Sequence, residues 1–313
     1  MKNCTKPEKF DGGKKFGGKG VTNAAARVNT IISPAIIGMD ASNQAEIDKA
    51  ILEICPDAKI KLGRNAVAAT SAAVLKAGAA SLGIPFYRHI GGANAMYLPV
   101  PGVAMVAGDE RYGGGITTPG GKPTMSVMAY GFNSFSDASY ACWEVHTRWA
   151  EKMKAKFGGL PNIRDFISVP KGVYNSDKEI WEDMLKTISE AGYAGKIGFQ
   201  MDVATDTYHN KEDGKYYGLF DNTPKTKEEL YDFYMQIIKD YPFVIIEDPF
   251  NEDDYDTTAA LTKESGIQIV RDDLFTTNPE RVAYGISKDA ANTVLLKVNQ
   301  VGTISEAFDM IQY

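Results

Sequence analysis

Four short apolar segments in the second half of the chain each end on a charged residue, and these charges could together bind a cation and move a proton. The segments are Ile197–Asp202, Phe243–Glu247, Ile267–Asp272 and Thr293–Lys297. Carboxylate oxygens are the ligands that a hard cation such as Mg²⁺ selects. A lysine held beside such a cation can act as a general base.

The spacing of the four segments predicts that their ends meet. Glu247 and Asp272 are 25 residues apart, and Asp272 and Lys297 are 25 residues apart, which fits one strand, one helix and a loop each time. In a parallel β/α barrel, the carboxyl ends of successive strands converge on one mouth. A single acidic residue after a strand is usually a helix cap or a turn residue. Four such charges in succession are hard to obtain from capping alone, so the pattern favours a site.

The segments between these candidate strands have the features of helices. Thr226–Glu229 is a capping box that opens the amphipathic stretch Leu230–Tyr241, and Asn278–Pro279 supplies an N-cap followed by proline at the first helical position. The apolar stretch Val244–Ile246 fits a parallel sheet that is covered on both faces. A doubly wound open sheet would give the same alternation, and the recurrent charges at strand ends favour the barrel.

The first third of the chain reads as helices followed by a domain boundary. Helices are expected over Val21–Pro34, Ser42–Ile54 and Asn65–Leu82. Leu98–Pro101 is expected to be an extended entry strand. We therefore expect a small domain over residues 1–97 and a larger barrel-like domain over residues 98–313.

Composition excludes several classes of function. A net charge of −6 argues against a general nucleic-acid binder, and no apolar run in the sequence is long enough to span a bilayer. The lysine-rich start lacks the apolar core of a signal peptide. Cys4, Cys55 and Cys142 are odd in number and widely spaced, which suits free thiols in a reducing compartment. A soluble, cytoplasmic protein is expected.

Several segments of the chain resemble the enolase family, the phosphopyruvate hydratases of glycolysis. The most specific are Ile246–Phe250, Gly266–Leu274, Thr277–Pro279 and Leu295–Gly302. The resemblance covers nearly the whole chain and is weakest over Gly102–Lys178. It implies an α/β fold in which a small α+β amino-terminal domain precedes an atypical, TIM-like β/α barrel.

The resemblance also implies a lyase reaction and roles for the four charged residues. Enolases dehydrate 2-phosphoglycerate to phosphoenolpyruvate. By motif, Asp202, Glu247 and Asp272 match the carboxylates that hold Mg²⁺, and Lys297 matches the base that takes the carbon-bound proton. A proton next to a carboxylate is very weakly acidic, so the dianionic enolate needs metal charge close by.

Other family positions are changed, which leaves the substrate-binding residues unassigned. Arg111 stands in place of the histidine of the Gly-Gly-Ser-His loop. Ser126 and Val127 replace the amide and carboxylate of the Met-Gln-Glu motif. In the segment Asp165–Ser168, Phe166 stands where the family carries the acid for hydroxide departure. We therefore expect little dehydration of 2-phosphoglycerate.

Compared with the family, the chain is expected to lack the first strands and the last barrel strands. An incomplete barrel exposes strand edges, which invite pairing with a second copy or with a full-length enolase. Three hypotheses remain open: an active enolase, a non-catalytic enolase paralogue that serves as a binding or assembly subunit, and a gene fragment. The changed residues favour the second and third.

Overall fold

The computed structural model describes residues 9–107, 111–112, 122–158, 162–163 and 166–312. The chain divides into two compact units. The first unit contains Met1–Tyr97, Phe275–Tyr284 and Val294–Tyr313. The second unit contains Leu98–Leu274 and Gly285–Thr293.

All the regular secondary structure within residues 9–97 of the first unit is helical. The elements are η1 Lys15–Gly18, α1 Thr22–Arg27, the π-helical turn η2 Val28–Ile32, α2 Ser33–Ile36, α3 Gln44–Glu53, α4 Ala58–Lys61, α5 Arg64–Ser81, α6 Phe86–Gly91 and η3 Gly92–Asn94. The three predicted helices are present, but the first is interrupted by the π turn. Ile32, Ile47, Ile51 and Val67 form the centre of its core.

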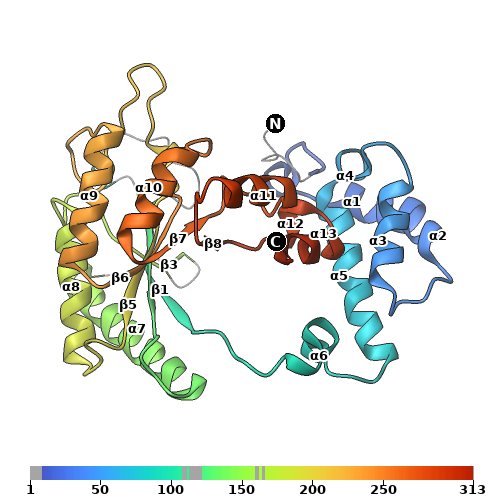
Figure 1. Cartoon of the computed structure of the whole chain (residues 1–313), viewed down its shortest axis with the longest axis horizontal. Coiled ribbons are helices and arrows are strands. Elements are labelled where there is room, and N and C mark those ends of the chain that lie inside the picture. The colour runs from blue at the N-terminus through green and yellow to red at the C-terminus, as the bar shows by residue number, and fades with distance from the viewer. Residues whose placement is uncertain (1–8, 108–110, 113–121, 159–161, 164–165, 313) are drawn as a thin grey trace. The chain divides into compact units, whose positions relative to one another are not determined.

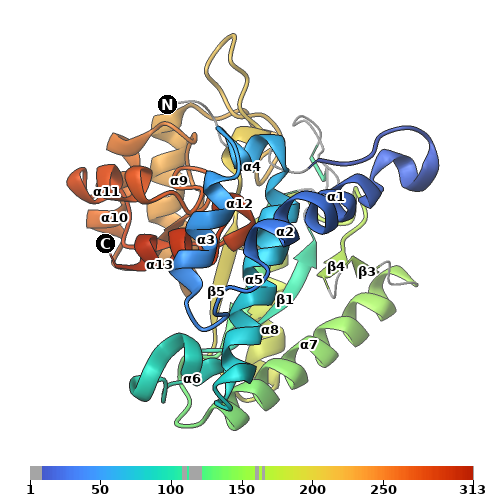
Figure 2. The same ribbon diagram turned by 90° about the vertical axis from the view of Figure 1, so that its right-hand side faces the viewer.

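The end of the chain completes this first unit. Two further helices, α12 Val298–Val301 and α13 Ile304–Ile311, follow in its last segment. The buried carboxylate of Asp48 in α3 accepts hydrogen bonds from the Ser71 hydroxyl at 2.6 Å and from the backbone N–H of Ser305 at 2.9 Å. The Ser71 Oγ in α5 also accepts from Ile304 N at 2.9 Å. These bonds hold α13 against α3 and α5 (Figure 2).

The second unit is built around an eight-stranded sheet with the order β3-β4-β1-β2-β5-β6-β7-β8. The strands are β1 Gly102–Ala107, β2 Thr124–Met128, β3 Asn162–Ile163, β4 Phe166–Ser168, β5 Gly198–Asp202, β6 Phe243–Glu247, β7 Gln268–Arg271 and β8 Thr293–Val294. β5, β6 and β7 pair in parallel, as predicted, whereas β2 is antiparallel to both β1 and β5. In this order the described strands do not close into a ring, which agrees with the expected incomplete barrel.

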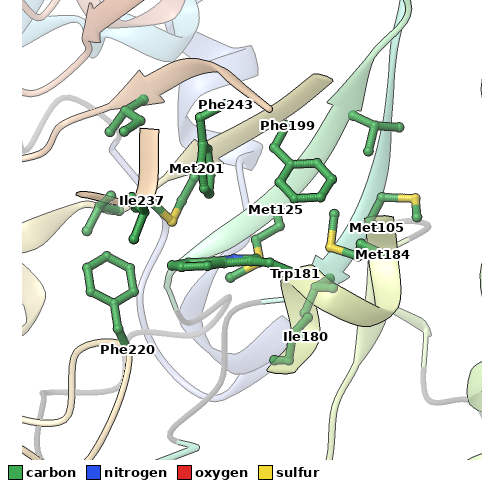
Figure 3. Close-up of a cluster of buried hydrophobic side chains, with 14 of the residues drawn as sticks. Met105, Met125, Ile180, Trp181, Met184, Phe199, Met201, Phe220, Ile237 and Phe243 are labelled. Atoms are coloured by element: carbon green, nitrogen blue, oxygen red, sulfur yellow. The ribbon is translucent and has the colours of Figure 1, made fainter. Parts of the chain in front are cut away.

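Helices cover this sheet and supply its core. The helices of the second unit are α7 Phe135–Phe157, α8 Asp177–Glu190, η4 Thr205–Thr207, α9 Lys227–Asp240 and α10 Tyr255–Ser265. The helix α11 Pro279–Ser287 is divided between the two units. α8, α9 and α10 lie along the sheet in Figure 1. The fully buried indole of Trp181 in α8 contacts Met125 Sδ at 3.0 Å and stands edge-on to Phe243 at 5.2 Å (Figure 3). This aromatic core fixes β2, β5 and β6, whose ends carry the candidate site.

Local sequence signals are confirmed where side chains cap the helices. Thr226 and Glu229 form the predicted capping box of α9. The Asn278 side chain accepts hydrogen bonds from the first backbone N–H groups of α11, at 2.9 Å from Glu280 and 3.2 Å from Arg281.

Two predicted strands are wrong in extent. Leu98–Pro101 is not a strand, and β1 begins only at Gly102, because Pro99 and Pro101 have no N–H to donate to a ladder. The predicted strand Thr293–Lys297 ends at Val294.

Within the described residues, no single helix is both long and apolar enough to cross a membrane. One pair of helices, Arg64–Ser81 with Phe86–Asn94, passes the test together by length and composition, with a bend of 100° between them.

Candidate functional site

Asp202 and Glu247 close neighbouring parallel strands and lie together. They are paired in the register of β5 and β6, which places both at the carboxyl ends of their strands. One carboxylate oxygen from each of Asp202, Glu247 and Asp248 lies within 4.8 Å of the other two. Asp202 is half-buried, and Glu247 and Asp248 are buried. The structure therefore brings together two of the three predicted metal ligands and adds Asp248.

Asp272 lies one strand further along, directly after β7. Its carboxylate groups with those of Asp248 and Asp273, again with one oxygen of each within 4.8 Å of the others. Asp248 is thus common to both groups, and Asp272 and Asp202 are not in the same one. We call these five side chains, Asp202, Glu247, Asp248, Asp272 and Asp273, the carboxylate cluster.

Asp248 holds the two strand ends in place, a role that the sequence did not reveal. It adopts a left-handed backbone conformation, with φ of 46°, immediately after β6. Its carboxylate accepts hydrogen bonds from the backbone N–H groups of Asp272 and Asp273, both at 3.1 Å. Asp248 therefore fixes the turn that follows β7 and with it the position of Asp272.

Arg271 lies beside the carboxylate cluster and contacts Asp248. Its side chain is fully buried, its Nε lies 3.5 Å from Asp248 Oδ1, and its other nitrogens donate to the carbonyl oxygens of Phe250 at 3.0 Å and Asn251 at 2.9 Å. Burial raises the pKa of Asp248, and the Arg271 charge and the two backbone N–H groups only partly oppose this. The apolar segment that predicted β7 gives no sign that Arg271 is buried beside Asp248.

Lys122 reaches the cluster from the antiparallel strand. Its Nζ forms an ion pair with Asp202 Oδ2. The residue lies just before β2, whose first residue, Thr124, is opposite Asp202 in the register of β2 and β5. An antiparallel strand starts where its neighbour ends, so Lys122 is delivered to the carboxyl end of β5.

Lys297 belongs to the first unit, whereas the carboxylate cluster belongs to the second. The prediction that Lys297 ends a strand is wrong, because this residue is the N-cap of α12. The Thr277 hydroxyl accepts a hydrogen bond from Lys297 N at 2.8 Å and donates to the Leu295 carbonyl oxygen at 3.3 Å. The Thr277 side chain thus bonds to the backbone of Leu295 and Lys297 where a neighbouring strand would otherwise do so. The backbone of Lys297 is extended, although it is not part of a β-strand.

Arg111, which replaces a family histidine, is committed to a buried ion pair. Its Nε and Nη2 lie 3.0 Å and 3.1 Å from the two carboxylate oxygens of Asp177, and its Nη1 donates to the Ala107 carbonyl oxygen at 3.0 Å. The Tyr112 hydroxyl donates to the same carboxylate at 2.8 Å. Burial alone would lower the pKa of Arg111, but the charge of Asp177, its hydrogen bonds and the neighbouring tyrosines together outweigh burial and raise the pKa.

The other changed positions lie in strands. Ser126 is half-buried in β2 opposite Gln200, and Val127 is buried beside it. Phe166 is half-buried in β4, next to the buried Ile167. Gly108–Glu110 and Asp165, which belong to the changed family segments, lie outside the described residues.

The donor set of the cluster fits a hard divalent cation. Its members offer only carboxylate oxygens, which suit Mg²⁺, Ca²⁺ or Mn²⁺ better than softer metals. Carboxylates gathered this closely repel one another, and a cation between them relieves the repulsion. The arrangement can therefore hold a divalent ion at the carboxyl edge of the sheet.

Comparison with known proteins gives one consistent result over nearly the whole chain. The family model described as Enolase, N-terminal domain, matches residues 4–90, and the one described as Enolase, C-terminal TIM barrel domain, matches residues 95–313. A protein named Enolase from Methanococcus aeolicus is 38% identical over 302 residues, which cover 96% of this chain and 69% of the relative. Those from Methanocaldococcus jannaschii and Thermococcus kodakarensis are each 40% identical, with the same two coverages.

Proposed function

The chain belongs to the enolase family, and from this premise we propose that the carboxyl edge of its sheet is the divalent-cation site of an enolase-type active site. The observation that carries the proposal is the grouping of Asp202, Glu247 and Asp248 at the ends of two adjacent parallel strands. Asp202, Glu247 and Asp272 would hold Mg²⁺, and Asp248 would position Asp272 through its backbone.

Lys297 is the proposed general base. In the family reaction, the base takes the carbon-bound proton of 2-phosphoglycerate, next to the substrate carboxylate. When bound, the cation would supply the positive charge that makes this proton acidic enough to remove. The Thr277 hydroxyl fixes the backbone at Lys297 and so limits where its amine can reach.

We further propose that loss of the hydroxide group is slow in this chain. The family acid position falls in β4, where the apolar Phe166 and Ile167 cannot donate a proton. Arg111 is occupied by Asp177, and Val127 is buried and apolar. A missing general acid alone typically costs about 10²–10⁴-fold in rate. Proton removal is therefore expected to be better preserved than complete turnover.

The test separates proton removal from dehydration. Protein purified from a host without its own enolase activity is incubated with Mg²⁺ and 2-phosphoglycerate in deuterated water. NMR then follows exchange at the carbon-bound position and formation of phosphoenolpyruvate in the same sample. We expect slow exchange with little phosphoenolpyruvate. Exchange should be lost in Lys297→Met and kept in Lys263→Met, which removes an exposed lysine of α10.

Each other outcome has a definite meaning. Rapid formation of phosphoenolpyruvate that depends on Lys297 would establish a fully active enolase and contradict the slow-dehydration proposal. Exchange that survives Lys297→Met would remove this lysine as the base. Binding of Mg²⁺ without any exchange would favour the non-catalytic paralogue, whose assembly with itself or with a full-length enolase can be measured by analytical ultracentrifugation.

A further inference from the structure

Lys122 is a basic side chain placed directly on a proposed metal ligand. Its Nζ pairs with Asp202 Oδ2, and both side chains are partly shielded, with exposed fractions of 26% and 18%. The ion pair between Lys122 and Asp202 follows from the fold. The register of β2 and β5 places Thr124 opposite Asp202, and Lys122 comes two residues before Thr124 in the chain.

The ammonium group and a divalent cation would compete for the same carboxylate. An oxygen of Asp202 lies within 4.8 Å of oxygens of Glu247 and Asp248, so Asp202 contributes to a concentrated negative charge. An ammonium group beside it offsets part of this charge without filling the cluster. A lysine is suited to withdraw again, because its compact charge is carried on a flexible four-carbon stem.

We propose that Lys122 is a tethered counter-ion of Asp202 that moves away when a divalent cation binds, and that it thereby sets the affinity of the site for the cation. The inference rests on the proposed metal site and goes beyond it by assigning a residue that weakens binding. It predicts that the chain binds Mg²⁺ less tightly than its carboxylates alone would allow.

The first experiment measures Mg²⁺ affinity by isothermal titration calorimetry. Lys122→Met and Lys122→Gln should each tighten binding by about 5- to 20-fold, within the usual range of coupling between two sites. Lys122→Arg keeps the positive charge and should stay near the wild-type affinity. The matched control is Lys186→Met, which removes an exposed lysine from α8 that is paired with Glu190 at 3.8 Å.

The second experiment asks whether Lys122 moves. The amines of the wild-type protein are acylated briefly with and without saturating Mg²⁺, and the modified lysines are quantified by peptide mass spectrometry. Release from Asp202 should raise labelling of Lys122 several-fold while labelling of Lys186 stays constant. Simple electrostatic weakening at a distance would change affinity but not this reactivity.

The outcomes distinguish the inference from the function on which it rests. If wild type and Lys122→Met bind Mg²⁺ equally well, the role of Lys122 is wrong and the metal site stands. If neither binds Mg²⁺ while both remain folded by circular dichroism, the metal site fails and the inference with it. Tighter binding by the variants, with unchanged Lys122 labelling in the wild type, would contradict the movement.

Discussion

Two groups of charges that are buried or partly buried in the second unit differ in their balance of sign. Around Asp177, one guanidinium meets one carboxylate through two parallel contacts of 3.0 and 3.1 Å, with the Tyr112 hydroxyl completing the group. In the carboxylate cluster, five acidic side chains meet two basic ones, Lys122 and Arg271, in the ion pairs described above. The first group is balanced within itself, and the second is acidic.

The difference separates two uses of a buried charge. A balanced pair is held at the start of α8 and ties it to the segment after β1, so its removal should damage the fold. The carboxylates of an acidic cluster repel one another when no cation is bound. Replacing one of them by a neutral side chain should therefore not destabilise the metal-free fold. Stability measurements on single variants can therefore distinguish the two groups.

The largest effect is expected at Asp177. Asp177→Ala leaves the Arg111 guanidinium buried without its carboxylate, which typically costs about 3–5 kcal/mol of unfolding free energy. Urea unfolding monitored by circular dichroism measures the loss. The double variant Arg111→Met/Asp177→Leu should recover most of it, because a buried pair can be replaced by apolar side chains. A loss below about 1 kcal/mol in Asp177→Ala, the range of an exposed pair, would show that this pair does not stabilise the fold.

The second largest effect is expected at Arg271. Its contact with Asp248 is the part of the carboxylate cluster that most resembles the pair of Arg111 and Asp177, because each joins a buried arginine to a buried aspartate. Arg271→Met removes two hydrogen bonds to carbonyl oxygens and the positive charge beside Asp248. We expect a loss of about 2–4 kcal/mol in unfolding free energy. Adding Asp248→Asn should recover part of it if charge is the cause. No recovery in the double variant would assign the loss to the carbonyl contacts.

Glu247→Gln should have the opposite sign. Removing one charge from the cluster relieves repulsion, so the metal-free protein should be as stable as wild type or more stable by up to about 1 kcal/mol. Wild type should gain about 1.4 kcal/mol from Mg²⁺ at ten times its dissociation constant, and the variant should not. Differential scanning calorimetry across a magnesium titration measures both, with Glu190→Gln in α8 as the control. A metal-free Glu247→Gln protein destabilised as strongly as Asp177→Ala would break the comparison.

The smallest effect is expected at Asp183 in α8, where one carboxylate near the surface meets two lysines. Tyr174, Lys152 and Lys156 contact its carboxylate. Partial burial tends to raise the pKa of Asp183, but the hydrogen bonds from Tyr174, Lys156 and Lys152 outweigh it and lower the pKa to about 2. Its stabilising contribution is therefore present above the unfolded pKa of 3.8 and is lost as pH falls toward about 2.

Asp183→Asn tests this at constant temperature. The variant should lose about 0.5–1 kcal/mol of unfolding free energy at pH 6, and its difference from wild type should shrink between pH 4 and about 2. Urea unfolding at several pH values measures the trend, with Asp240→Asn as an exposed control on α9. A difference that does not depend on pH would mean that the Asp183 charge contributes nothing.

Much of the fold follows from local pattern. The apolar runs of β5, β6 and β7 and the caps of α9 and α11 act over a few residues, and the predictions for them are confirmed. Lys297 shows the limit of this reasoning, because an apolar run before a charge predicted a strand end. The Thr277 hydroxyl, twenty residues away, provides its backbone partner instead, which no local pattern could indicate.

By itself, the sequence determined the family, the α/β architecture and three acidic residues at the carboxyl ends of consecutive parallel strands. These depend on periodicity, capping and motif, which are properties of neighbouring residues. Only the tertiary structure decided that Asp248 joins both carboxylate groups, that Arg271 is buried beneath it, and that Arg111 is committed to Asp177. It also placed Lys122 on Asp202. The physical reason is that strand register and side chains distant in the sequence set the balance of charge in a partly buried site. Local sequence patterns predict neither the register nor those distant contacts.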